Sequence, residues 1–302
     1  MRSVLKQAFE RLLLQSGPAA LSRQRWRRGA VILAYHNILP AGVARGGADP
    51  SLHLPRERFA AQLDETMRRC EVVSLADLLA GCPAANRPVA AITFDDCYSG
   101  ALSAGLEELA SRGLPATYFV TPGCIDGHAF WWDAFVERDG APIRPVTREH
   151  LLEELGGQTE PVRRWGATNL REVEVPEVAR AASLATLRAA GAIRGISFGS
   201  HTWTHPNLAR LEPAALEREL EEPLSWIAAT IAPPVRALAF PYGRFSEPVV
   251  EALPGAGYQV GLAITGGWFR REAARGPVLP RLNVPSGLSD TGFALRLAGV
   301  LQ

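Results

Sequence analysis

The stretch Val89-Ala90-Ala91-Ile92-Thr93-Phe94-Asp95-Asp96 decides the fold of this chain. Its apolar run, with several β-branched side chains, is typical of a strand that helices cover on both faces. Two carboxylates follow at the carboxyl end of the strand, where parallel sheets place their ligand sites. Because adjacent strand residues point to opposite sides, we expect Asp95 and Asp96 to have different roles. A helix N-cap with an exposed neighbour would also explain the pair, so the stretch alone leaves both interpretations open.

Strands and helices alternate on both sides of this stretch. Apolar runs followed at short intervals by helical periodicity favour parallel strands with right-handed crossovers. An α/β barrel fits this order better than a dinucleotide-binding fold, because no Gly-x-Gly-x-x-Gly opens a helix and no phosphate-binding loop occurs. We predict strands at 30–35, 71–75, 89–94, 116–120, 193–198, 235–240, 259–263 and 279–284, with helices that include 55–69, 101–112, 213–229 and 291–301.

The totals agree with one large domain. A chain of 302 residues with 47% hydrophobic and 21% charged residues can bury a substantial core. The net charge of +1 gives no reason to expect nucleic acid as a partner. The cysteines form no Cys-x-x-Cys pair, so we expect reduced, mostly buried thiols rather than a zinc finger; they are Cys70, Cys82, Cys97 and Cys124.

Residues 1–28 are predicted to form an amphipathic helix with a basic tail, and residues 29–302 to form the catalytic barrel. The usual fate of amphipathic helices favours a helix that docks on the domain, and an anchor on an anionic membrane surface is the alternative. No apolar run is long enough to span a bilayer, and charged residues interrupt what would have to be a signal peptide. We therefore expect a cytoplasmic protein, or one at the inner face of the membrane. The oligomeric state stays open.

The strand–helix alternation lapses between residues 126 and 182, where the aromatic cluster Phe130-Trp131-Trp132-Asp133 is followed by short charged helices. Long connections in compact domains are usually functional or disordered, so we interpret this segment as an insertion over the barrel mouth. Its tryptophans could cap the core, or they could stack on the apolar faces of sugar rings.

Two histidines, His201 and His205, stand four residues apart after a predicted strand. At that spacing two imidazoles can bind one cation, and the Asp pair could supply a third ligand while leaving positions open for water and substrate. Thr202 occupies the place of the glutamate found in zincin proteases, which argues against that class. His36 ends the first predicted strand and is either a site residue or a hydrogen-bonded structural histidine.

Three motifs occur in order along the chain: Thr93-Phe94-Asp95-Asp96, His201-Thr202-Trp203-Thr204-His205, and Arg236-Ala237-Leu238-Ala239-Phe240-Pro241-Tyr242-Gly243. Together they resemble three signatures of the polysaccharide deacetylases, the NodB homology domain that is also carbohydrate esterase family four. The resemblance runs from about residue 31 to residue 284. It implies a distorted (β/α)7-type barrel and metal-dependent removal of N- or O-acetyl groups from sugars.

The resemblance also implies a division of roles. Asp95 would be the general base, and the metal would be held by Asp96, His201 and His205. Chemically, a divalent cation polarises the acetyl carbonyl and acidifies a water molecule while the neighbouring carboxylate takes the proton. Two imidazoles and one carboxylate make Zn²⁺ the expected cofactor, with Co²⁺ and Ni²⁺ as alternatives.

Further residues follow from the same resemblance. Arg236 would orient Asp95 and keep it ionised, and the backbone N–H of Tyr242 would help to bind the oxyanion. The family's Leu-x-His is missing, since residues 279–284 read Leu-Pro-Arg-Leu-Asn-Val and no histidine follows His205. Either His36 or His128 would substitute as the general acid, or the substrate would be an ester that needs less help. Substrate contacts are expected from Trp132, Asp133, Trp203 and Pro241.

These observations predict a deacetylase that acts on an acetylated carbohydrate, either a polysaccharide or a lipid-linked glycan precursor. An amidase that cleaves a non-sugar C–N bond in the same fold is an alternative. A carbohydrate-binding pseudoenzyme is a third interpretation, but a binding module has no need of both a base and a metal triad.

Overall fold

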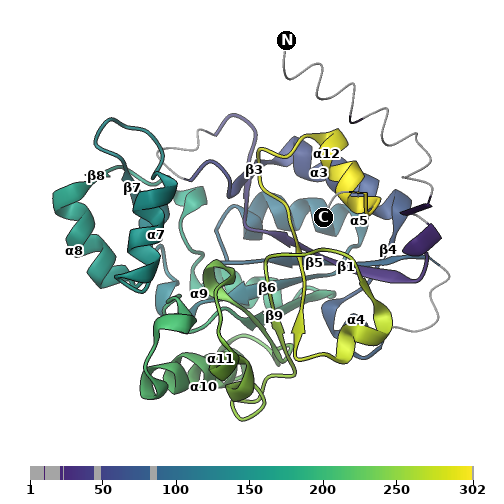
Figure 1. Ribbon diagram of the computed structural model, residues 1–302. Helices are drawn as coiled ribbons and strands as arrows, with labels where there is room; N and C mark the ends of the chain where they lie inside the picture. Colours follow the sequence, from purple (N-terminus) through teal and green to yellow (C-terminus); the bar gives the residue numbers. More distant parts are fainter. Residues whose placement is uncertain (1–9, 11–20, 23, 44–48, 82–86, 301–302) are drawn as a thin grey trace.

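The computed structural model describes residues 10, 21–22, 24–43, 49–81 and 87–300. Its centre is a curled, mainly parallel sheet, with strands β1, β5, β6, β9, β10 and β11 side by side in that order (Figure 1). Every neighbouring pair along this path is parallel, as the alternation of strands and helices predicts. The strands are β1 (Gly29–Tyr35), β5 (Val89–Phe94), β6 (Ala116–Val120), β9 (Ile196–Ser200), β10 (Ala237–Ala239) and β11 (Val260–Leu262).

A divided last strand joins the two edges of this sheet. Its first half, β13 (Val278–Leu279), pairs in parallel with β11, and its second half, β14 (Leu282–Asn283), pairs in parallel with β1. Pro280 and Arg281 lie between the halves, where the strand passes from one edge of the sheet to the other. The sheet therefore curls into a distorted barrel, which confirms the predicted fold class.

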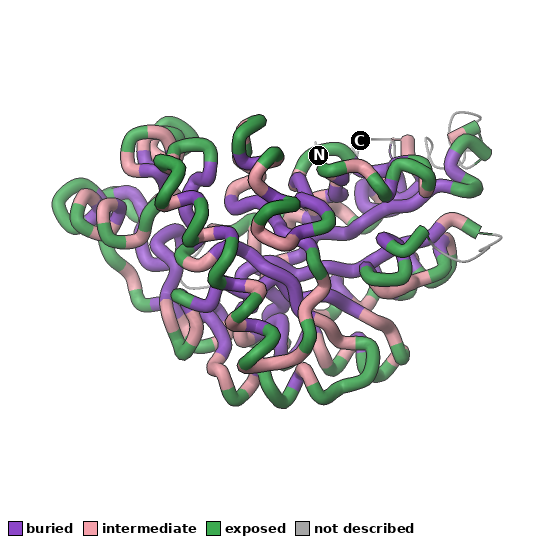
Figure 2. The backbone as a smooth tube through the Cα atoms, turned by 90° about the horizontal axis from the view of Figure 1, so that it is seen from below, coloured by how far each residue is buried: buried purple, intermediate pink, exposed green. Residues whose placement is uncertain are grey.

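Helices surround the sheet and leave its strands buried, as the purple centre of Figure 2 shows. Short accessory strands pair at the rim: β2 (Asn37–Leu39) with β3 (His53–Pro55), β4 (Glu71–Val72) with β5, and β12 (Phe269–Arg270) antiparallel to β1. The helices outside the insertion are α3 (Arg56–Arg69), α4 (Leu75–Leu79), the π-helical turn η1 (Ala101–Gly105), α5 (Leu106–Arg112), η2 (Pro122–Cys124), α9 (Leu184–Gly191), η4 (Leu208–Arg210), α10 (Pro213–Thr230), η5 (Pro241–Gly243), α11 (Glu247–Ala252), η6 (Arg271–Arg275) and α12 (Asp290–Leu297).

The segment that interrupts the alternation forms a separate group of elements at one side of the barrel (Figure 1). Its two short strands pair with each other and stay outside the main sheet. An isolated bridge between Tyr98 and Ala181 ties its far end to the loop after β5. Its elements are α6 (Trp131–Ala134), β7 (Phe135–Val136), α7 (Pro145–Glu153), α8 (Thr159–Asn169), β8 (Arg171–Glu172) and η3 (Glu177–Ala179).

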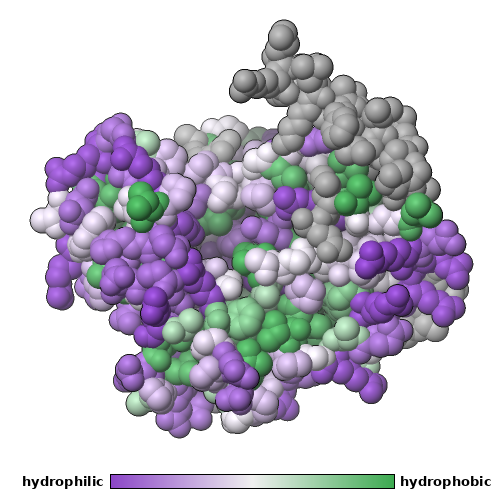
Figure 3. Space-filling model, viewed as in Figure 1, coloured by the Kyte–Doolittle hydropathy of each residue, from purple (hydrophilic) through white to green (hydrophobic). Residues whose placement is uncertain are grey.

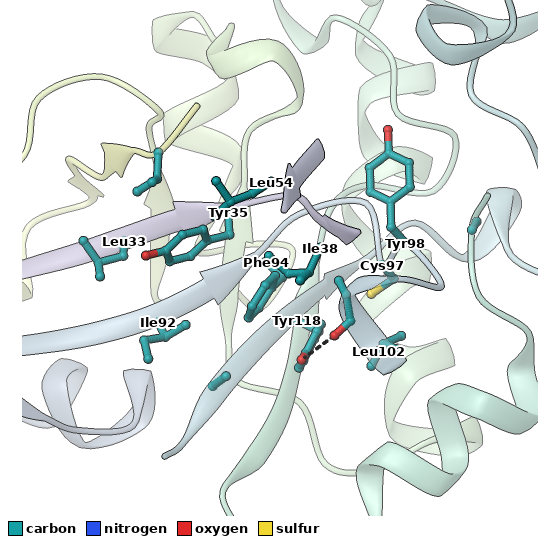
Figure 4. Close-up of a cluster of buried hydrophobic side chains, with 14 of the residues drawn as sticks. Leu33, Tyr35, Ile38, Leu54, Ile92, Phe94, Cys97, Tyr98, Leu102 and Tyr118 are labelled. Carbon is teal, nitrogen blue, oxygen red and sulfur yellow. Dashed lines mark hydrogen bonds between the residues drawn. The ribbon is translucent and has the colours of Figure 1, made fainter. Parts of the chain in front are cut away.

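The core below the site is aromatic, and Figure 4 shows part of it. Phe94 of β5 stacks on Tyr118 of β6, with ring centroids 4.7 Å apart and planes inclined by 10°. The Tyr118 hydroxyl donates to the carbonyl of Ala101, so the phenol is both packed and hydrogen-bonded. This cluster fixes the end of β5, from which the two aspartates emerge.

A close backbone approach explains one glycine near this core. A Cβ atom on Gly100 would lie 2.4 Å from the carbonyl oxygen of Ile38, so no side chain fits there. The contact lets β2 lie directly against the start of η1. The β2–β3 pair does not follow from the sequence pattern, because each strand has only three residues and the two are joined through a glycine-containing loop.

The predictions for the N-terminal helix, the cysteines and a membrane span can be compared with the structure only in part. Most of the predicted N-terminal helix and Cys82 lie outside the described residues. The other three cysteines are buried and unpaired, as predicted. No helix in the described part of the chain is long and apolar enough to cross a bilayer.

Candidate active site

A cavity of about 450 Å³ opens at the carboxyl ends of the barrel strands. The barrel contributes side chains from the ends of β1, β5, β9, β10 and β14, and the insertion contributes one wall. The hollow lies between the insertion and the barrel in Figure 3. Its lining includes His36, Asp49, Ser51, Asp95, Asp96, Trp132, Phe135, Ile143, Arg148, His201, His205, Tyr242 and Asn283.

Three predicted ligands meet at the bottom of this cavity. Oδ1 of Asp96 lies 3.4 Å from Nε2 of His201 and 3.2 Å from Nε2 of His205. The two Nε2 atoms are 3.1 Å apart, and all three side chains are buried. Strand ends therefore bring together the residues that the sequence predicts as a triad.

The donor chemistry of this cluster fits a divalent cation. Nδ1 of His201 lies 2.8 Å from the carbonyl oxygen of Ala239, so Nδ1 carries the proton and Nε2 offers a lone pair. Oδ1 of Asp96 is buried without a hydrogen-bond donor in the described structure. Lone pairs that converge on a buried carboxylate repel one another unless a cation lies between them. Asp96, His201 and His205 would hold that cation.

The loops that carry the site are locally strained. Six non-glycine residues in the described chain have positive φ, and all except Asp126 lie in these loops: Asp96, Cys97, Thr202, His205 and Tyr242. Such conformations cost about 1–3 kcal/mol each and persist only where the surroundings determine them. The strained backbone aims the ligands into the cavity.

Glu219 of α10 supports the loop between the two histidines. Its carboxylate accepts hydrogen bonds from the backbone N–H groups of Trp203 and Thr204, at 2.7 and 2.9 Å, and from the Thr204 hydroxyl at 2.6 Å. Within the loop, the Thr202 hydroxyl accepts from the N–H of His205 at 3.0 Å. The carboxylate of Glu219 thus stabilises the loop that carries His201 and His205, the two candidate metal ligands.

Asp95 is held by an arginine that the sequence analysis does not assign. Nη1 and Nη2 of Arg281 donate to Oδ1 and Oδ2 of Asp95, at 2.7 and 2.8 Å. Arg281 is 0% exposed, and its Nε also donates to the carbonyl of Ala263. Burial alone would raise the pKa of Asp95, but the charge and the two hydrogen bonds of Arg281 outweigh it, so the pKa lies below its ordinary value. The carboxylate is ionised at neutral pH, as a base requires.

The prediction that Arg236 holds Asp95 is wrong. Arg236 is exposed and donates to the carbonyl of Gly257, near the start of β10 rather than its carboxyl end. The guanidinium that binds Asp95 instead belongs to Arg281, which lies between β13 and β14. The signal was present in the sequence as an arginine inside an apolar strand, Leu279-Pro280-Arg281-Leu282, but a buried arginine is recognisable only once its partner is known.

Tyr242 and Trp132 form the walls beside His205. The Tyr242 ring meets the His205 ring edge-on at 4.5 Å, and the Trp132 ring lies 4.7 Å from the same imidazole. The Tyr242 hydroxyl is tied to the Gly157 carbonyl at 3.0 Å. Its backbone N–H donates no hydrogen bond within the described part of the chain. The predicted oxyanion donor is therefore free.

Three predicted substrate contacts lie away from the cavity wall. Asp133 is buried behind Trp132, where it accepts from the Tyr98 hydroxyl at 2.6 Å and lies 2.9 Å from Nε2 of His53. Trp203 packs on Gly123 and Trp226 at a different cavity. Pro241 is buried and does not line the site. Trp132 does line it.

The buried network behind Trp132 escaped the sequence analysis. The Trp132 indole N–H donates to the Tyr98 hydroxyl at 2.8 Å, so Asp133 and Tyr98 together orient the ring. Burial raises the pKa of Asp133, although hydrogen bonds from His53 and Tyr98 oppose the rise. Asp133 therefore positions a wall residue instead of touching a ligand.

His36 lies in the cavity wall, whereas His128 lies outside it. Burial lowers the pKa of His36, and the charges of Asp95 and Asp96 offset only part of that effect. The imidazole is therefore neutral near pH 7. Among the described histidines that line the cavity, His36 is the one outside the Asp96 cluster.

The cavity at the ends of the parallel strands thus holds an ionised carboxylate, Asp95, beside a candidate metal site. Residues 83–261 match the model of the polysaccharide deacetylase family. The chain therefore belongs to that family, whose members hydrolyse acetyl amide or ester bonds. No curated protein matches the chain significantly.

Solved structures share the fold at low identity. The Streptococcus pyogenes deacetylase PplD in complex with acetate matches with 18% identity and a TM-score of 0.62, over 90% of this chain and 99% of that one. A Bacillus cereus polysaccharide deacetylase matches with 17% identity and a TM-score of 0.64, over 90% and 69%. IcaB from Ammonifex degensii matches with 18% identity and a TM-score of 0.60, over 90% and 97%. These likenesses agree with the barrel architecture.

The assignment of Arg281 predicts a pH effect. In Arg281→Gln the buried Asp95 loses its counter-charge, so its pKa should rise and the acidic limb of the kcat/KM profile should move to higher pH. The free energy of unfolding should fall by about 3–5 kcal/mol, the cost of leaving a buried charge unpaired. If this variant fails to fold, Arg281→Lys keeps the positive charge but loses the two-point hydrogen bond, so it should move the acidic limb in the same direction by a smaller amount. Arg236→Gln is the matched control, and an equal shift in both variants would contradict the assignment.

The support from Glu219 predicts an effect on metal affinity. In Glu219→Gln an amide NH2 group, which cannot accept a hydrogen bond, replaces one of the two accepting oxygens. The loop between His201 and His205 should therefore loosen, and the metal affinity should fall about 10- to 100-fold. Equilibrium dialysis against zinc measures this directly, without reference to turnover. Glu217→Gln, on the exposed side of the same helix, should bind like the unmodified protein. Equal affinities in the two variants would show that Glu219 does not support the site.

Proposed function

We propose that the chain hydrolyses N- or O-linked acetyl groups of a sugar. The observation that carries this proposal is the ionised, arginine-held Asp95 directly beside the Asp96, His201 and His205 cluster. A substrate acetyl group placed over this cluster would have a base within reach on one side and the free Tyr242 N–H on the other. The intact base argues against a binding module that has lost catalysis.

The cofactor we propose is Zn²⁺, with Co²⁺ and Ni²⁺ as alternatives that suit the same two imidazoles and one carboxylate. Bound there, a divalent cation would polarise the acetyl carbonyl and lower the pKa of a water molecule. Asp95 would take the proton from that water. The Tyr242 N–H would stabilise negative charge as it develops on the carbonyl oxygen.

We propose that His36 is the general acid, which delivers a proton to the leaving atom. It is the imidazole of the cavity wall that does not belong to the ligand cluster, and it lies at the carboxyl end of β1 next to Asp95. A neutral imidazole can accept a proton that Asp95 has taken and pass it on. An amide nitrogen needs this help more than an ester oxygen does.

Acetate release tests the proposal. The zinc-loaded protein should release acetate from N-acetylated chito-oligomers or from an O-acetylated sugar, and the preferred substrate identifies the bond. Asp95→Asn should lose activity by about 100-fold or more, and His36→Ala should lose a comparable factor while its metal content stays unchanged. Turnover at the unmodified rate in Asp95→Asn would refute the role of the base.

The alternatives give different results in the same experiment. An amidase would release no acetate from either sugar but would cleave a non-sugar C–N bond, with the same dependence on Asp95. A binding module would retain both sugars without cleavage, at full metal occupancy.

We further propose that residues 1–28 contact an anionic membrane surface. In the described part of this segment Arg25, Arg27 and Arg28 are exposed. Arg270 is exposed beside them, because it pairs with Gly29 at the amino end of β1. This basic surface lies at the opposite end of the strand from the cavity. Each arginine near an anionic surface contributes about 1 kcal/mol of attraction.

Vesicle co-sedimentation tests this contact. The protein should bind vesicles that contain anionic phospholipid and should bind neutral vesicles weakly. Replacing Arg25, Arg27 and Arg28 by glutamine should weaken binding about 100-fold, following the same attraction per arginine. Replacing Arg164, Arg194 and Arg218, which are also exposed, removes the same charge elsewhere. Equal loss in the two triple variants would refute a local surface.

A further inference from the structure

The cavity has two chemically different walls. The wall from the barrel and from the segment before β3 mixes polar and apolar groups. Its polar side chains include His36, Asp49, Ser51 and Asn283, and its apolar ones are Pro50, Leu52, Phe240 and Ile264. The wall from the insertion is almost entirely apolar beyond Trp132, and it consists of Phe135, Pro142, Ile143 and Pro145. A molecule bound in this cavity would therefore find most of its hydrogen-bonding partners on the barrel side and mainly hydrocarbon on the insertion side.

The apolar wall continues to the surface of the molecule. Phe135 is buried, Ile143 is half-buried against the core, and Pro142 and Pro145 are exposed at the rim. Val146 follows Pro145 in the first turn of α7 and is 75% exposed, more than any other large apolar side chain in the described part of the chain. Isolated exposed apolar residues are common, but Val146 directly follows Pro145, which lines the cavity.

The rim is held in a fixed conformation. Glu137 accepts hydrogen bonds from the N–H of Arg144 at 2.9 Å and from the hydroxyl of Thr147 at 2.7 Å. The carboxylate of Asp139 accepts from the N–H of Ala141 at 3.0 Å. The segment that presents the apolar side chains is therefore ordered before anything binds, and little conformational entropy would be lost on binding.

The one charged group of this wall is already engaged. Nη1 of Arg148 lies 2.9 Å from Oδ2 of Asp49, and the guanidinium lies over the Trp131 ring. A second sugar placed along the wall would leave most of its hydroxyl groups without partners, which is costly. A hydrocarbon or aromatic group would instead cover the exposed side chains and gain from burial.

We propose that the insertion wall and its rim bind an apolar substituent of the acetylated sugar, so that the substrate is a glycoside with an apolar aglycone. This inference rests on the proposed function and narrows its substrate class. The sugar hydroxyls face Asn283 and the paired Asp49 and Ser51, whose oxygens can still accept hydrogen bonds besides those they already make. The aglycone leaves the cavity over Ile143 towards Val146. An alkyl chain and an aromatic ring share the required chemistry.

Glycosides with different aglycones test the inference. The measurement is kcat/KM for the methyl, butyl, hexyl and phenyl β-glycosides of N-acetylglucosamine, or of the O-acetylated sugar if the ester is preferred, below their aggregation limits. Each methylene that the wall covers should raise kcat/KM by up to about fourfold. The alkyl and phenyl arms distinguish a lipid-like chain from an aromatic aglycone. Equal kcat/KM for the methyl, hexyl and phenyl glycosides would overturn the inference.

Variants show where the preference arises. Ile143→Ser and Val146→Ser should each lower the ratio of kcat/KM between the hexyl and methyl glycosides. Ile193→Ser removes a 38%-exposed isoleucine after α9, outside the cavity lining, and should leave that ratio unchanged. A ratio that does not respond to the two rim variants would place the aglycone elsewhere and overturn the inference.

Binding to the Asp95→Asn variant separates this inference from the proposed function. Calorimetric dissociation constants for the same glycosides do not depend on turnover. Tighter binding of the hexyl glycoside without acetate release from any glycoside by the unmodified protein would support the apolar site and refute the deacetylase. Acetate release without any aglycone preference in rate or binding would support the deacetylase and refute the apolar site.

Discussion

The buried ion pair between Asp95 and Arg281 is the constraint on which the rest of the site depends. It joins the end of β5 to the break in the last strand, across the interior of the barrel. A buried carboxylate without this partner would take up a proton and could not serve as a base. The same contact holds the joining strand in place, so the ionisation of Asp95 and the closure of the barrel share one interaction.

A second layer of polar contacts gives the site its rigidity. Glu219 of α10 holds the loop between His201 and His205 by hydrogen bonds. His53, Asp133 and Tyr98 form a network that orients Trp132, a residue of the insertion. These groups do not touch the cavity centre, yet they restrict the side chains that do. The strained residues of the loops are tolerable because this support surrounds them.

The sequence predicts the parts of the site that local pattern determines. Asp95, Asp96, His201 and His205 each follow a recognisable strand, and strands that run in parallel bring their ends together. Arg281 could not be predicted in this way, because its role depends on how the two edges of the sheet meet. Trp203 lies between two ligands in the sequence, but the turn that aims the histidines inward points its ring towards α10. A position between two cavity residues in the sequence therefore does not place Trp203 in the cavity.

The divided last strand also makes the charge of Asp95 depend on closure of the barrel. Asp96, His201 and His205 follow β5 and β9, which are joined through β6 and do not pair with β13 or β14. The counter-ion of Asp95 lies between β13 and β14, the two halves that pair with opposite edges of the sheet. A barrel opened at this strand would keep all three candidate cation ligands, but Asp95 would lose its arginine and would take up a proton more readily. Loss of closure would therefore change the charge of one carboxylate while the neighbouring candidate cation site stays complete.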